Sequence, residues 1–220
     1  MTRPAWLLAL VLTLPIASAA QEGTAPVREP WSFGAVVAPV ALPEGVTALY
    51  GYVGVPEMGV GFRQGLEGFE IEARARLDYF RLAGLFDATL RRQVLEQDGL
   101  SLAPTLSLGL VLNSGSEYLD EDNYPGVLLR IAPGAVAGWR VAETVTVLGL
   151  VDLPLDLGLS PSGTRRFQAL AGPGTEIYLA QGVTLLVAGQ LGVESFKRPR
   201  EDAITRLGYQ VKLGIGARLF

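Results

Sequence analysis

The chain has 220 residues, 49% of them hydrophobic, and a formal net charge of −4 at pH 7. This length suits a single domain, and the mildly acidic balance argues against a nucleic-acid partner. There is no Cys and no His. Disulfides, thiolate nucleophiles and a lipoprotein anchor are therefore excluded, and the commonest general base and metal ligand is missing.

Residues 1–20 have the three parts of a secretory signal peptide. Arg3 supplies the positive charge, residues 6–16 form the apolar centre, and residues 17–20 give a small-residue cleavage site. The alternative, an uncleaved membrane anchor, needs a longer apolar run. We expect a cleaved signal peptide over residues 1–20 and a polar periplasmic lead-in over residues 21–30.

The remaining chain is expected to be all β. Strands are predicted at residues 31–42 and 46–55, with residues 58–63 as a separate short strand or a continuation of the second. Eight more strands are predicted after residue 68, which gives a total of ten, with eight or twelve as alternatives. The eight lie at residues 69–79, 86–94, 101–113, 127–139, 145–156, 167–177, 183–194 and 203–220.

The alternation of residue types supports these strands. Over residues 69–79, five charged residues alternate strictly with six apolar ones, a pattern that an amphipathic helix would not keep. Over residues 102–112, Leu occupies almost every second position opposite small residues. The mean hydropathy of +0.32 is high, yet after the signal peptide no run reaches the roughly 18 apolar residues of a helical span.

The last strand has an apolar face that includes Tyr209 and Leu213 and a polar or glycine face that includes Gly214 and Gly216. The chain then ends on Phe220. A last strand that ends in Phe resembles the C-terminal signal of bacterial outer-membrane β-barrels, although here Phe220 falls in the polar frame. The resemblance is one of architecture, and the length matches the small OmpA- and OmpX-like size class.

This resemblance implies an antiparallel up-and-down transmembrane β-barrel over residues 31–220, located in the cell outer membrane of a Gram-negative bacterium. Apolar side chains would face lipid and polar ones the lumen. The connections agree with it, because short turns near Asp98, Arg140 and Gln181 alternate with long segments at residues 113–125, 158–165 and 196–202. The implied partners are outer-membrane lipid, lipopolysaccharide and the barrel-assembly machinery, the last through the C-terminal strand.

Charged residues of the lumen frame carry nearly balanced signs, so we expect them to pair, since unpaired charges in a narrow barrel are costly. The lumen set is Glu70, Glu72, Arg74, Arg76, Asp78, Asp87, Arg91, Arg130, Asp152, Asp156, Glu176, Glu194, Arg206, Lys212 and Arg218. It predicts a sealed, salt-bridged interior with a structural or surface-interaction role. One alternative is a narrow porin or channel for small solutes. Another is a soluble secreted lipocalin-like or β-sandwich binding protein, with the charged face of residues 70–78 outward.

We expect no catalytic residue, metal or cofactor. Outer-membrane phospholipases, lipid A deacylases and omptin-like proteases, the enzymes that the resemblance suggests, use a catalytic His that is absent here. Glu70 and Glu72 are interpreted as ion-pair partners of Arg74 rather than as a catalytic carboxylate pair.

Two polar loops are candidate binding sites. Asp120, Glu121, Asp122 and Asn123, with Glu117 nearby, offer oxygen ligands for Ca²⁺ but lack the spacing of an EF-hand loop. We therefore expect a solvated acidic loop. A second loop contains the basic residues Lys197, Arg198 and Arg200. These are a candidate contact for lipopolysaccharide phosphates, with a solvated loop as the alternative.

Overall fold

A computed structural model describes residues 34–38, 40–180 and 182–219. The expected signal peptide (residues 1–20), the lead-in (residues 21–30), the first three residues of the strand expected at 31–42 and Phe220 lie outside the described residues.

The described residues form twelve β-strands. These are β1 (Thr47–Val55), β2 (Glu57–Leu66), β3 (Phe69–Asp78), β4 (Ala83–Arg91), β5 (Leu95–Gln97), β6 (Leu100–Ser114), β7 (Pro125–Ala142), β8 (Val145–Asp152), β9 (Leu155–Ser160), β10 (Arg165–Ala180), β11 (Val183–Lys197) and β12 (Ile204–Arg218). Within this part of the chain no helix has the length and apolar character needed to cross a membrane.

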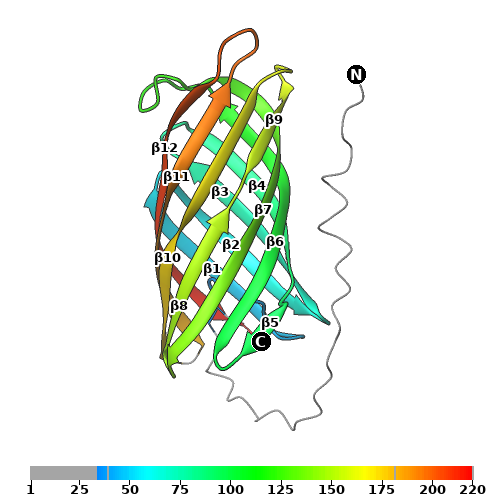
Figure 1. Cartoon of the computed structure of the whole chain (residues 1–220), viewed down its shortest axis with the longest axis vertical. Helices are drawn as coiled ribbons and strands as arrows, with labels where there is room; N and C mark the ends of the chain where they lie inside the picture. Colours follow the sequence, from blue (N-terminus) through cyan, green and yellow to red (C-terminus); the bar gives the residue numbers. More distant parts are fainter. Residues whose placement is uncertain (1–33, 39, 181, 220) are drawn as a thin grey trace.

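The strands form one antiparallel sheet that closes into a barrel (Figure 1). Closure is made by β1 and β12, which pair from Ala48 and Arg218 to Val55 and Val211. The twelve strands of the described chain give ten crossings, because β5 continues β4 along β6 and β9 continues β8 along β7 and β10. The predicted fold class and the predicted count of ten are confirmed.

Exposure along the strands is inverted relative to a water-soluble protein. Leu108 is 53% and Leu213 55% exposed, whereas Arg63, Glu70 and Glu176 are 0% exposed. Such an apolar exterior around a charged interior is the arrangement of a transmembrane barrel. The charged face of β3 points inward, which argues against the soluble lipocalin-like or β-sandwich alternative.

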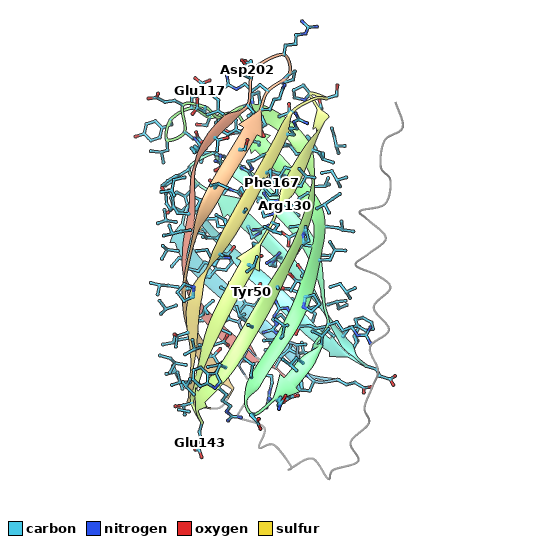
Figure 2. All side chains as sticks on the ribbon, in the orientation of Figure 1. Tyr50, Glu117, Arg130, Glu143, Phe167 and Asp202 are labelled. Carbon is cyan, nitrogen blue, oxygen red and sulfur yellow. The ribbon has the colours of Figure 1, made fainter. Side chains whose placement is uncertain are left out.

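The two ends of the barrel differ. Short connections at Gly68, Gly99, Glu143 and Gly182 lie at one end, called the turn end below. Longer loops at residues 115–124, 161–164 and 198–203 lie at the other, the loop end. Figure 2 shows Glu143 at the turn end and Glu117 and Asp202 at the loop end.

The prediction is wrong at the start of the domain. Residues 34–38 and 40–42 form bends rather than a strand, and residues 58–63 belong to the full-length strand β2. The total still reaches ten, since β1 and β2 are the two crossings before Gly68. Residues 34–38 and 40–42, called the plug below, lie inside the barrel.

The plug packs against inward side chains of the wall. Its residues Val36, Ala38 and Val40 join Tyr50, Leu148 and other buried residues in one apolar cluster. Two glycines of the wall make room for this segment. A Cβ on Gly216 would lie 2.9 Å from the Cβ of Ala35, and one on Gly65 would lie 2.7 Å from the carbonyl oxygen of Leu42.

The facing of the strands can be tested at Leu108, an outward residue of β6. We expect Leu108→Arg to lower the free energy of unfolding in lipid bilayers by about 2–4 kcal/mol, because a guanidinium near the midplane loses its hydration. Leu108→Phe is the matched control and should change it little. Urea titration of the bilayer-inserted protein measures both, and equal effects would contradict the assigned facing.

Candidate functional site

The plug is held by the carboxylate of Glu176 on β10. The backbone N–H groups of Ala35 and Val36 donate to its Oε1 over 2.9 and 3.0 Å, and those of Val37 and Ala38 to its Oε2 over 2.8 and 2.7 Å. No Lys or Arg of the described chain forms an ion pair with Glu176. Four consecutive N–H groups therefore compensate this buried charge.

The wall also binds the carbonyl groups of the plug. Arg91 donates to the carbonyl oxygens of Val37 and Val40, and Arg63 to that of Ala38 over 3.4 Å. Arg63 additionally donates two hydrogen bonds of 2.8 Å to Glu70, which accepts a further one from the N–H of Leu42. Buried backbone groups need such partners, and here charged side chains supply them instead of a neighbouring strand.

The middle of the lumen is filled by ion pairs. Arg74 and Arg76 each lie 2.6 Å from Asp87, and Arg76 lies 3.2 Å from Glu57. Glu57 also accepts a hydrogen bond from the hydroxyl of Tyr52. A polar cavity of about 60 Å³ remains beside these residues. It has room for roughly a few water molecules and for no larger solute.

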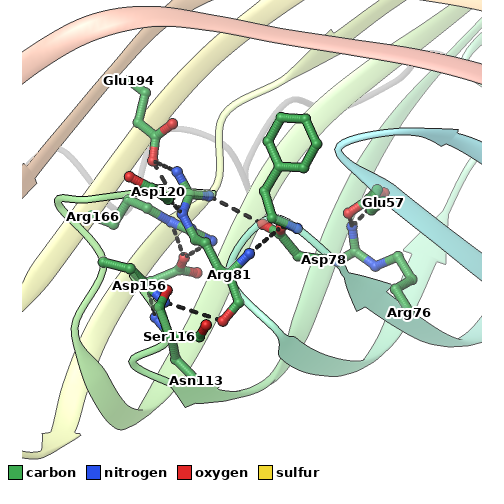
Figure 3. A network of polar contacts seen from close by, with 12 residues as sticks. Glu57, Arg76, Asp78, Arg81, Asn113, Ser116, Asp120, Asp156, Arg166 and Glu194 are labelled. Carbon is green, nitrogen blue, oxygen red and sulfur yellow. Dashed lines mark hydrogen bonds and ion pairs between the residues drawn. The ribbon is translucent and has the colours of Figure 1, made fainter. Parts of the chain in front are cut away.

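A second cluster closes the loop end, around Arg81 in the connection between β3 and β4. Arg81 lies 3.1 Å from Asp78, 2.8 Å from Asp120 and 2.7 Å from Glu194 (Figure 3). Arg206 pairs with the same Asp120 over 2.6 Å. Because Asp120 belongs to loop 115–124, these pairs draw that loop into the mouth of the barrel.

Most charges of the predicted lumen set therefore lie in two ion-paired groups and in the attachment of the plug. Glu72 pairs with Arg91, and Arg130 pairs with Asp156 over 2.6 Å. Lys212 joins the group in the middle of the lumen, 3.8 Å from Glu57. Asp152 accepts a hydrogen bond from Gln190, and Arg218 ends β12 at the turn end.

Five further charged residues of the described chain are buried in the lumen although the alternation did not predict them, namely Glu57, Arg63, Arg81, Asp120 and Arg166. Arg166 lies two residues before Gln168, at an inward-facing position of β10, so extending the alternation of this strand toward its start could have identified Arg166. Arg63 and Glu57 required the correct boundaries of β2. Arg81 and Asp120 lie in connections, where no periodicity marks a buried side chain.

The two polar loops contact one another. Arg198 donates to the carbonyl oxygen of Asn123 over 3.2 Å, whereas Arg200 is exposed and Lys197 is half-buried. The expectation of a solvated acidic loop is wrong at Asp120, whose exposed fraction is 7%. Glu117 and Glu121 of the same loop are exposed. Across the described chain, no group of three or more His, Cys, Asp or Glu side chains could hold a metal ion.

Comparison with known proteins gives structural likeness alone. No family model and no curated protein matches the sequence. The NanC porin is 8% identical, with 79% of this chain and 100% of the porin covered and a TM-score of 0.44. The outer membrane protease OmpT from Escherichia coli is 10% identical, with 79% of this chain and 93% of the protease covered and a TM-score of 0.39. These proteins differ in activity, and likeness at this level assigns neither activity to this chain.

Glu176→Gln tests the attachment of the plug. The neutral amide presents one acceptor oxygen to four N–H groups, and hydrogen bonds to a charged group contribute about 1.5–3 kcal/mol each. We expect the backbone amides of residues 34–38 to exchange hydrogen faster by at least about tenfold, as measured by mass spectrometry. Glu143→Gln, in an exposed turn, is the control. Unchanged exchange in Glu176→Gln would contradict the assigned role.

Acid should release loop 115–124. Burial raises the pKa of Asp120, but hydrogen bonds from Arg206 and the charge of Arg81 outweigh it and lower the pKa from 3.8 to about 2. A lowered pKa means that the carboxylate stabilises the closed loop above about pH 4 and that this contribution is lost as the pH falls to about 2.

A fluorophore on Tyr118→Cys, an exposed position in this loop of a chain without Cys, reports the release. Its anisotropy should drop between about pH 4 and pH 2. With Asp120→Asn in the same protein, the anisotropy should already be low at pH 7. An acid transition that persists unchanged in Asp120→Asn would assign the release to another group.

Proposed function

We propose that this protein is an integral outer-membrane β-barrel with a sealed lumen and a structural or surface-interaction role without catalysis. One observation carries the proposal: the lumen is blocked along its length, by the plug near the turn end, by the ion pairs of Arg76 in the middle and by the Arg81 cluster at the loop end. The cavity of about 60 Å³ between them is too small for a nutrient-sized solute.

The two ends support an orientation. Outer-membrane barrels have short turns in the periplasm and longer loops outside, so the turn end is periplasmic. The chain enters β1 at this end, next to the last residues of β12. Lys197, Arg198 and Arg200 then lie on the outer side, where lipopolysaccharide phosphates are available to them, and β12 is the strand for the barrel-assembly machinery.

The carboxylates of the lumen are poorly suited to catalysis. Glu57, Asp87 and Asp156 are each bound by Arg side chains. A carboxylate held in this way is a poor general base, and there is no His to replace it. The remaining cavity has no room for a substrate beside them.

A narrow channel is the second candidate, and one observation favours it. The plug is attached by side chains of the wall and forms no strand pairing. Its release would therefore leave the barrel sheet intact.

Planar-bilayer recording separates the two candidates. We expect no steady conductance from the wild type, from a variant lacking residues 34–42 or from Arg81→Ala. Steady conductance should appear only when both changes are combined with Arg76→Ala, which opens the ion pairs in the middle of the lumen. The physical reason is that each block closes the lumen independently. Heat-modifiable migration of unboiled protein in gels would verify that each variant is folded.

A steady wild-type current, with an ion selectivity that reverses in Arg76→Glu, would reject the sealed lumen in favour of the narrow channel.

A further inference from the structure

The barrel wall has a gap on one side of its loop end. β12 pairs with β11 along its length, from Ile204 and Phe196 onward, but its pairing with β1 stops at Val211 and Val55. Residues 204–210 of β12 therefore have no strand partner on that side in the described chain. Seven unpaired residues form a free sheet edge.

The gap opens into a pocket of about 200 Å³. Its rim is apolar and comes from four parts of the chain. Pro56 lies in the β1–β2 connection, Phe80 in the β3–β4 connection, Leu119 in loop 115–124, and Leu207 and Tyr209 on β12. Because Leu207 and Tyr209 are 67% and 41% exposed on the outer wall, the pocket is reached from the side of the barrel.

The floor of the pocket is polar and reaches the lumen. Arg81, Asp120, Gln168, Glu194 and Arg206 form it. Asp120 and Glu194 retain only 6% and 5% exposure of their side chains, whereas Arg206 retains 31%. A molecule that enters from the wall therefore meets the guanidinium of Arg206 before these two carboxylates, while the more exposed Asp122 lies 3.6 Å from the same guanidinium.

The free edge lies along the apolar belt of the outer wall. Leu207 is four residues beyond Val211, about 13 Å along the strand, and it continues the outward apolar series of β12. Backbone groups on an unpaired edge that faces lipid need other hydrogen-bond partners. An anionic head group seated in the pocket can accept hydrogen bonds from N–H groups of this edge, and an apolar tail can remain outside.

We propose that this lateral pocket binds an amphiphile with a small anionic head, such as a phosphate or a carboxylate. The head contacts Arg206, and the tail lies along Leu207 and Tyr209 on the lipid side. The volume of about 200 Å³ corresponds to roughly six or seven waters, which suits such a head and excludes an acyl chain. The inference rests on the proposed membrane location, which supplies amphiphiles to this side of the wall.

Native mass spectrometry of the full protein in a neutral maltoside detergent tests the proposal. The probe is lysophosphatidic acid with a 12-carbon chain, and the comparison is lysophosphatidylcholine of the same chain length. We expect one tightly retained lysophosphatidic acid per barrel. Inorganic phosphate should displace it only at far higher concentration, because phosphate lacks the tail.

Two variants with matched controls locate the site. Arg206→Gln should weaken binding by about tenfold or more, since a charge-assisted contact is lost, while Arg165→Gln, at an exposed arginine of the same end, should not. Leu207→Trp fills the mouth without touching the ion pairs and should also abolish the adduct. Val193→Trp, the residue paired with Leu207 on the closed side of the wall, should retain it.

Equal binding to wild type and Leu207→Trp, or no preference for the anionic head, would overturn the proposal. Efficient displacement by inorganic phosphate alone would also overturn it and indicate a phosphate site. The measurement uses solubilised protein and reports on the pocket alone. Its failure is therefore distinct from a failure of the sealed-lumen proposal, which bilayer conductance decides.

Discussion

The compensation of one buried charge determines how the plug is attached. Glu176 is 0% exposed and points into a closed barrel, where an unpaired carboxylate would be strongly destabilising. Ion pairs join Glu70 to Arg63 and Glu72 to Arg91. Glu176 is a third carboxylate at this level, and it forms no such close pair with a Lys or Arg of the described chain. Four N–H groups of the plug take that role, which ties residues outside the sheet to the wall of the barrel.

This attachment explains features that would otherwise be weaknesses of the wall. Leu148 and Leu186 are apolar residues on the lumen side, and they are buried because the plug covers them. Position 216 is a glycine, because the Cβ of any larger residue there would collide with Ala35. Buried ion pairs contribute little net stability, yet breaking one leaves a costly charge. The lumen charges therefore specify where the plug and loop 115–124 are seated, while apolar packing and the strand ladder supply the stability.

The sequence allows the strands of the barrel wall to be predicted well. The plug and the buried charges of the connections are predicted poorly. Over residues 69–79 a strict period of two identifies both the strand and its facing, because every second side chain of a barrel strand meets the same environment. The plug resembles a strand in composition, since Ala35, Val36 and Val37 are small or β-branched. Its position inside the barrel depends on hydrogen bonds to Glu176, which is more than a hundred residues away in the sequence. A local pattern cannot reveal such a contact. Arg81 and Asp120 occupy connections, and their burial follows from three-dimensional closure.

At the loop end, the cluster that closes the lumen and the lateral pocket share the residues Arg206 and Asp120. Arg206 holds Asp120 by a bidentate pair of 2.7 and 2.6 Å, and this pair is both part of the lumen closure and part of the pocket floor. An anion bound at Arg206 competes with Asp120 for the same guanidinium. By linkage, occupancy of the lateral pocket weakens the hold on loop 115–124, and release of the loop strengthens anion binding to the same degree. A barrel blocked along its axis can thus still couple the lipid side of its wall to its outer surface.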